Sequence, residues 1–104
     1  MDLNELREEI DSIDDQLVKL FCQRMDVAAR VADYKRENNL PIFHPGRERA
    51  ILQKVADRAG PEMSNYTRVL YSMLFELSRS YQSKRNNIDS PLYKKITNAI
   101  EKTP

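Results

Sequence analysis

The sequence has few of the residues that build cross-linked, metal-bound or strand-rich folds. Its 104 residues include one cysteine, one histidine, two glycines and no tryptophan. One cysteine cannot form an intramolecular disulfide, and together with one histidine it cannot supply the ligands of a structural zinc site. We therefore predict no metal, and the lone Cys22, interpreted as a packing residue, favours a reducing, cytoplasmic location.

The chain also lacks an excess of charge and a long apolar run. Its 17 lysines and arginines nearly balance 16 acidic residues, for a formal charge of +1, which argues against a nucleic-acid or membrane partner held by bulk electrostatics. No apolar run approaches the roughly 20 residues of a membrane span, and the first residues are acidic rather than signal-like. Any cationic function must therefore be local.

The apolar residues recur at alternating spacings of three and four, which is typical of helices, and show no sustained period of two. We predict an all-α fold with one very long N-terminal helix. The expected helices, bounded by Pro, Gly and Asn signals, cover about residues 2–38, 47–59 and 64–84, with a possible short fourth helix over 91–100.

The first helix carries one continuous apolar seam. Its members are Leu3, Leu6, Ile10, Ile13, Leu17, Leu20, then Arg24, then Val27, Val31 and Tyr34. At 1.5 Å per residue the helix is about 50 Å long, which is more than two shorter helices can cover. The simplest cover is a second copy, so the seam predicts a homodimer.

Arg24 interrupts this seam with a guanidinium. Burying it unpaired would cost several kcal/mol, so it needs an anionic partner. That partner is either a protein carboxylate, for which Glu48 on the apolar stripe of the second helix is available, or a bound anion. Lys35 lies about three turns later on the same face, roughly 16 Å along the helix, so the two cations could hold a small dianion.

Further polar residues accompany this pair. Ser78 and Gln82 lie one turn apart on the inward side of the third helix, where each is most often a satisfied core hydrogen bond. Arg7 precedes Arg24 by about 25 Å of helix and can approach it only from an antiparallel second copy.

The combined spacing resembles the all-helical class of chorismate mutases, including the mutase domains of bifunctional chorismate mutase and prephenate dehydratase proteins. The resemblance covers about residues 3–85. It rests on Leu6 to Ile10, Asp14, Arg24, Lys35, Arg47 to Arg49, Ser78 and Gln82. It implies an intertwined homodimer of three-helix chains that converts chorismate to prephenate in phenylalanine and tyrosine biosynthesis, without a cofactor. Residues 1–85 would form the mutase domain, and 86–104 a C-terminal extension or linker.

The resemblance also implies residue roles. Arg24, and Arg7 of the other copy, would bind the two substrate carboxylates, with Ser78 assisting. Lys35 and Gln82 would contact the ether oxygen, which gains negative charge as the C–O bond breaks.

At the other end of the substrate, Arg47 would add positive field and Glu48 would accept the ring hydroxyl. The family usually has an aspartate where this chain has His44, and its contact there involves the backbone. We expect His44 to cap the second helix less well, at about 0.5–2 kcal/mol of local stability, and to lie exposed in a looser loop.

Two alternatives remain open from the sequence. An isochorismate pyruvate lyase uses a similar helical site and would release pyruvate. A non-catalytic helical dimerisation or regulatory module would instead pair Arg24 with Glu48 and bind no ligand.

Overall fold

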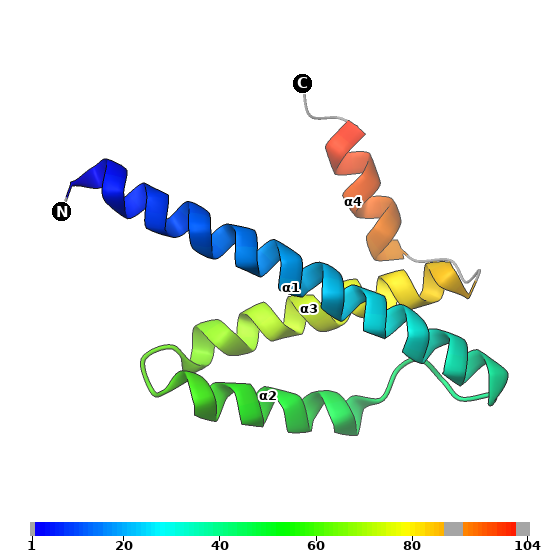
Figure 1. Cartoon of the computed structure of the whole chain (residues 1–104). Coiled ribbons are helices and arrows are strands. Elements are labelled where there is room, and N and C mark those ends of the chain that lie inside the picture. The colour runs from blue at the N-terminus through cyan, green and yellow to red at the C-terminus, as the bar shows by residue number, and fades with distance from the viewer. Residues whose placement is uncertain (1, 87–90, 102–104) are drawn as a thin grey trace.

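The computed structural model describes residues 2–86 and 91–101, of which 91–93 are described by their backbone alone. The described residues form the helices α1 (Leu3–Glu37), α2 (Pro45–Ala59), α3 (Ser64–Arg85) and α4 (Pro91–Glu101), shown in Figure 1. The predicted all-helical fold and the short fourth helix are confirmed. None of the described helices combines the length and the apolar character needed to cross a bilayer.

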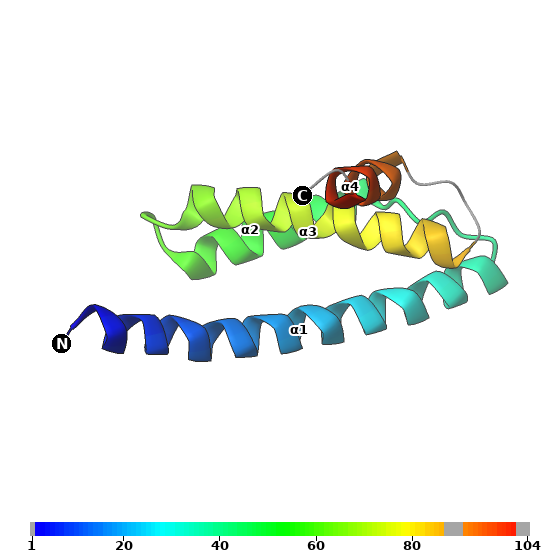
Figure 2. The ribbon, with the colours of Figure 1, turned by 90° about the horizontal axis from the view of Figure 1, so that it is seen from above.

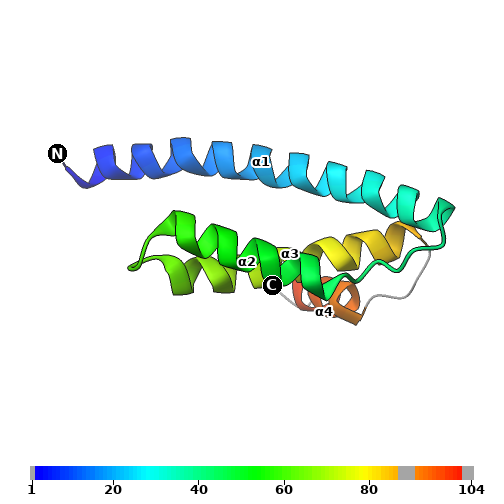
Figure 3. The ribbon, with the colours of Figure 1, turned by 90° about the horizontal axis from the view of Figure 1, so that it is seen from below.

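Helix α3 is the central element of the chain. It packs against α1, α2 and α4. Figures 2 and 3 show α1 in one layer and α2 and α3 in a second layer, with α4 on the side of α3 opposite to α1. Residues on successive faces of α3 therefore meet different helices.

The ends of α1 follow the residues that predicted them. At its start Asp2 accepts a hydrogen bond from the backbone N–H of Glu5, at 2.8 Å. At its end the N–H of Leu40 donates to the carbonyl of Lys35, and Asn39 adopts a left-handed conformation with φ of 54°. Asparagine tolerates that conformation better than most residues, so the chain turns sharply here into the loop that leads to α2.

Three successive turns of α3 bond to three successive turns of α1, which runs in the same direction. Ser78 accepts a hydrogen bond from Arg24, the Gln82 amide donates to the carbonyl of Ala28, and the Asn86 amide donates to the carbonyl of Ala32. Ala28 and Ala32, together with Ala29, are buried. Small side chains let the two backbones approach closely, and this register fixes Arg24 opposite Ser78.

No other described residues cover the first half of α1. Its seam residues from Leu3 to Leu20 are between 42% and 60% exposed. On α3, Tyr66 and Val69 are also exposed, at 73% and 72%. The uncovered apolar surface thus lies on both layers, and the buried apolar residues lie where α3 packs against α1 and α2.

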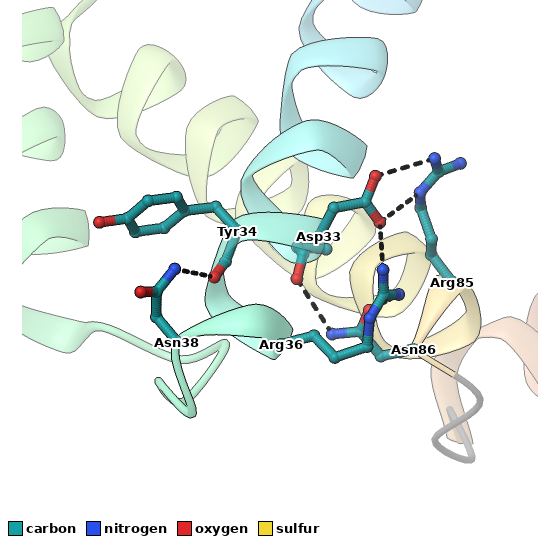
Figure 4. Close-up of polar contacts among 7 residues, drawn as sticks. Asp33, Tyr34, Arg36, Asn38, Arg85 and Asn86 are labelled. Carbon is teal, nitrogen blue, oxygen red and sulfur yellow. Dashed lines mark hydrogen bonds and ion pairs between the residues drawn. The ribbon is translucent and has the colours of Figure 1, made fainter.

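An ion pair holds the far ends of α1 and α3 together (Figure 4). Arg85 donates from Nε and Nη2 to the two oxygens of Asp33, each at 3.0 Å, and Arg36 lies 3.3 Å from the same carboxylate. These hydrogen bonds from the Arg85 guanidinium lower the pKa of the Asp33 carboxyl below its usual range.

This pair makes part of the stability depend on pH. Because the pKa of Asp33 is lower in the folded than in the unfolded chain, its contribution is present above the unfolded pKa and is lost as pH falls through the folded pKa. We expect Asp33→Asn to lower the free energy of unfolding at pH 7, and the difference from the wild type to shrink as pH falls through the folded pKa of Asp33, measured by urea denaturation.

The matched control is Asp26→Asn, which removes an exposed pair with Arg30 inside α1. It should have the smaller effect at pH 7, because a pair within one helix joins no two elements. An Asp33→Asn difference that stays constant from pH 7 to about pH 2 would contradict the assignment.

Candidate functional site

A cavity of about 530 Å³ lies between the middle of α1, the start of α2 and the second half of α3. Its lining includes every predicted site residue except Arg7. These are Arg24, Lys35, His44, Arg47, Glu48, Ser78 and Gln82. Apolar side chains such as Val27, Ile51 and Phe75 complete the wall. Arg7 lies on the exposed first half of α1, about 25 Å of helix from Arg24, so the single chain does not bring it to this cavity.

Arg24 keeps its positive charge in the cavity wall. Its Nη1 donates to the Ser78 hydroxyl at 2.7 Å, and its guanidinium lies 5.7 Å from the ring centre of Phe75 and 6.0 Å from that of Tyr71. Within residues 2–86 and 91–101 no carboxylate pairs with Arg24, so the possible pairing with Glu48 is wrong. A half-buried guanidinium bonded to a neutral hydroxyl is poised to receive an anion.

Lys35 and Gln82 are held by main-chain carbonyls. The Lys35 ammonium donates to the carbonyl of Ile42 in the loop between α1 and α2, at 2.7 Å, and the buried Gln82 amide donates to Ala28 at 3.0 Å. An ammonium has three N–H groups and a primary amide has two, so both side chains retain donors beyond these bonds.

Glu48 pairs with Arg79, a residue that the sequence analysis did not select. Arg79 Nη1 donates to both oxygens of the Glu48 carboxylate, and its guanidinium lies 4.9 Å from the ring centre of Phe43. Arg79 also lines the cavity. No local signal could have found this pair, because the two residues lie on different helices and 31 positions apart.

His44 caps α2, which begins at Pro45, two residues earlier than predicted. Its Nδ1 accepts a hydrogen bond from the backbone N–H of Arg47 at 3.0 Å. The expectation that His44 caps poorly missed this acceptor, since an imidazole nitrogen can replace the aspartate oxygen when it carries no proton. The side chain is exposed, as predicted, and the cap places Arg47 in the first turn, at the cavity.

A second cavity, of about 320 Å³, adjoins the first. Its lining shares Arg24 and Arg47 with the first cavity and adds Lys54, Arg58 and Tyr71. The cationic wall of the site therefore continues along α2.

The family model of chorismate mutase type II matches residues 6–83. The chain belongs to this family. The match spans α1 from its second turn, all of α2 and nearly all of α3, and it stops before α4. The site of this chorismate mutase type II chain therefore lies wholly inside the region that defines the family.

Several curated relatives match shorter segments. The T-protein of Haemophilus influenzae is 43% identical over 61 residues, which is 56% of this chain and 16% of that protein. The bifunctional chorismate mutase/prephenate dehydratase of Aquifex aeolicus is 44% identical over 54 residues, 52% of this chain and 15% of that protein. The chorismate mutase of Methanocaldococcus jannaschii is 38% identical over 53 residues, 51% of this chain and 54% of that protein. No solved structure matches the chain.

These matches cover only part of each relative. They span about a sixth of the first two proteins and about half of the third. The relatives thus support the family assignment, and what the whole protein does is a separate inference.

The cap at His44 gives a prediction for stability. His44→Ala should lower the free energy of unfolding by about 0.5–2 kcal/mol, because the N–H of Arg47 loses its acceptor. His44→Asp should recover that loss, since a carboxylate accepts the same bond and its charge suits a helix N-terminus. Urea denaturation measures both; equal stability of the two variants would contradict the cap.

Proposed function

We propose that this chain catalyses the rearrangement of chorismate to prephenate, a step in phenylalanine and tyrosine biosynthesis. The observation that carries the proposal is Arg24, which lines a cavity with Lys35 and Arg47 and has no carboxylate partner in the described part of the chain. Chorismate carries two carboxylates, and a wall with several cations suits a small dianion. Membership of the chorismate mutase type II family supports the same reaction.

The chemistry requires little from the protein beyond confinement and electrostatics. Within one substrate molecule the ether C–O bond breaks while a C–C bond forms, so no nucleophile or general base is needed. The rate rises when the substrate is held in its reactive conformer and when donors face the ether oxygen as it gains negative charge. Lys35 and Gln82 act as these donors, since they stand on opposite helices whose register is fixed by the bonds between α1 and α3.

The remaining side chains hold the rest of the substrate. Arg24 binds one carboxylate with help from Ser78, to which it is already hydrogen-bonded. Arg47 adds positive field from the first turn of α2. Glu48 accepts the ring hydroxyl, and His44, which also lines the cavity, contacts the substrate through its backbone.

The second carboxylate is bound by Arg7 of another copy, in an intertwined homodimer. Support comes from the exposed seam of α1, which a second copy would cover. Charge supports it too, because residues 2–20 contain seven acidic and two basic residues, whereas the adjoining wall of α2 is cationic. An antiparallel second α1 would bring Arg7 to a site that its own chain cannot supply.

The same proposal covers the organisation of the chain. Residues 1–85 form the mutase domain, which agrees with the end of α3 at Arg85. Residues 86–104 form an extension that includes α4; its segments 87–90 and 102–104 lie outside the described residues. We place the protein in the cytoplasm, as the single Cys22 suggests.

Removing the charge of Arg24 tests the proposal. Arg24→Met should lower kcat/KM for chorismate by about two orders of magnitude or more, because the substrate loses a charge-assisted contact, while the circular dichroism spectrum stays unchanged. Arg30→Met is the control, since Arg30 lies on α1 with an exposed side chain and does not line the site. Its kcat/KM should equal that of the wild type.

The assay also separates the other functions. Loss of chorismate absorbance no faster than the uncatalysed rate in the wild type would end the proposal. Formation of pyruvate from isochorismate, rather than prephenate from chorismate, would assign the lyase activity. If Arg24→Met unfolds, as judged by its circular dichroism spectrum, the non-catalytic module is favoured.

Subunit complementation tests the shared site. Arg7→Ala and Arg24→Ala should each be nearly inactive alone, because every site lacks one arginine. Unfolding them together in urea and refolding should restore about a quarter of wild-type activity, since about half of the dimers are then mixed and each holds one intact site of two. Each variant refolded alone is the control, and no recovery on mixing would contradict a site built from two copies.

A further inference from the structure

Glu48 is the one carboxylate among the described residues that line the cavity. Arg24, Lys35, Arg47 and Arg79 line it as well. A flexible carboxylate among several cations pairs with one of them, and a cation that it occupies is no longer free for an anionic ligand. The choice of partner for Glu48 therefore decides how much positive charge the site offers.

In the structure Glu48 forms an ion pair with Arg79. One guanidinium nitrogen of Arg79 donates to both carboxylate oxygens, and the two side chains are only 31% and 22% exposed. The ring of Phe43, from the loop before α2, lies against the same guanidinium. Arg79 is thus fixed by contacts with α2 and with the loop, rather than placed as a free surface charge.

Ser78, the residue before Arg79, explains why Arg24 and Arg79 do not compete for Glu48. Adjacent residues on a helix point about 100° apart. Ser78 meets Arg24 of α1, whereas Arg79 meets Glu48 of α2. Arg24 is therefore given a neutral partner and Glu48 a cationic one, from consecutive positions of α3.

We propose that Arg79 is a positioning residue that holds Glu48 away from the anion-binding cations. Because the pair of Arg79 and Glu48 is neutral, the charges of Arg24, Lys35 and Arg47 remain for a dianionic substrate. The pairing also leaves Glu48 a fixed hydrogen-bond acceptor for a hydroxyl of that substrate. The identity of the substrate rests on the proposed function; the positioning of Glu48 does not.

Kinetics of Arg79→Met test the proposal, since methionine keeps the length of the side chain and removes its charge. Glu48 should then pair with a binding cation, and KM for chorismate should rise about tenfold, with a smaller change in kcat. In a Glu48→Gln background, the same substitution should change KM by no more than about twofold, because no carboxylate remains to be held. Arg79→Lys, which keeps the charge, should stay near the wild-type KM.

Arg85→Met is the matched control. Arg85 is also an arginine of α3 paired with a carboxylate, but its partner Asp33 does not line the cavity. This variant should leave KM unchanged. A tenfold rise in KM for Arg79→Met that persists in full with Glu48→Gln, or that Arg85→Met reproduces, would overturn the proposal.

A crystal structure of Arg79→Met gives a readout that needs no turnover. We expect the Glu48 carboxylate within about 4 Å of the charged nitrogens of Arg24, Lys35 or Arg47. A Glu48 that pairs with none of these three would refute the positioning role, even if the wild type rearranges chorismate. If the wild type is inactive, the proposed function is refuted, and the crystal structure of Arg79→Met still decides whether Arg79 positions Glu48. If Arg79→Met does not fold, Arg79→Leu, which also removes both the donor to Glu48 and the charge, provides the same tests.

Discussion

The close contact between α1 and α3 is the constraint on which the site depends. Alanines at Ala28 and Ala32 allow the helix backbones to approach, and side chains one turn apart on α3 reach the main chain of α1. The same register puts Ser78 opposite Arg24. A larger side chain at either alanine would separate the helices and move the Gln82 amide on α3 away from Arg24 and Lys35 on α1.

The charges of the cavity are organised by which helix each residue meets. α3 stands between α1 and α2, so its consecutive residues can serve different partners. Arg24 receives a hydroxyl, which leaves its charge uncompensated, while Glu48 receives the guanidinium of Arg79. A carboxylate repels a dianion less when a neighbouring cation neutralises it, and Arg79 does this for Glu48.

The single chain leaves a large apolar surface on the half of α1 that precedes the site. That surface and the acidic character of residues 2–20 both suit the second copy that we propose, which would contribute Arg7 to the cavity. α4 lies on the opposite side of α3, beyond the region that defines the family. α4 therefore packs on α3, but none of its described residues lines the cavity.

The local amino-acid sequence was enough to predict the helices and their ends. Asp2 begins α1, Asn38 and Asn39 end it, and Gly60 closes α2, because capping and turn preferences act over a few residues. Helical spacing likewise predicted that Arg24 faces inward. The partners of the charged residues depended on the packing of helices that are distant in the chain. Periodicity shows which face of a helix a residue occupies, but it carries no information on which residue of another helix stands opposite. The bond of Arg24 to Ser78, 54 positions away, and the pairing of Glu48 with Arg79 exist only once α3 lies between α1 and α2.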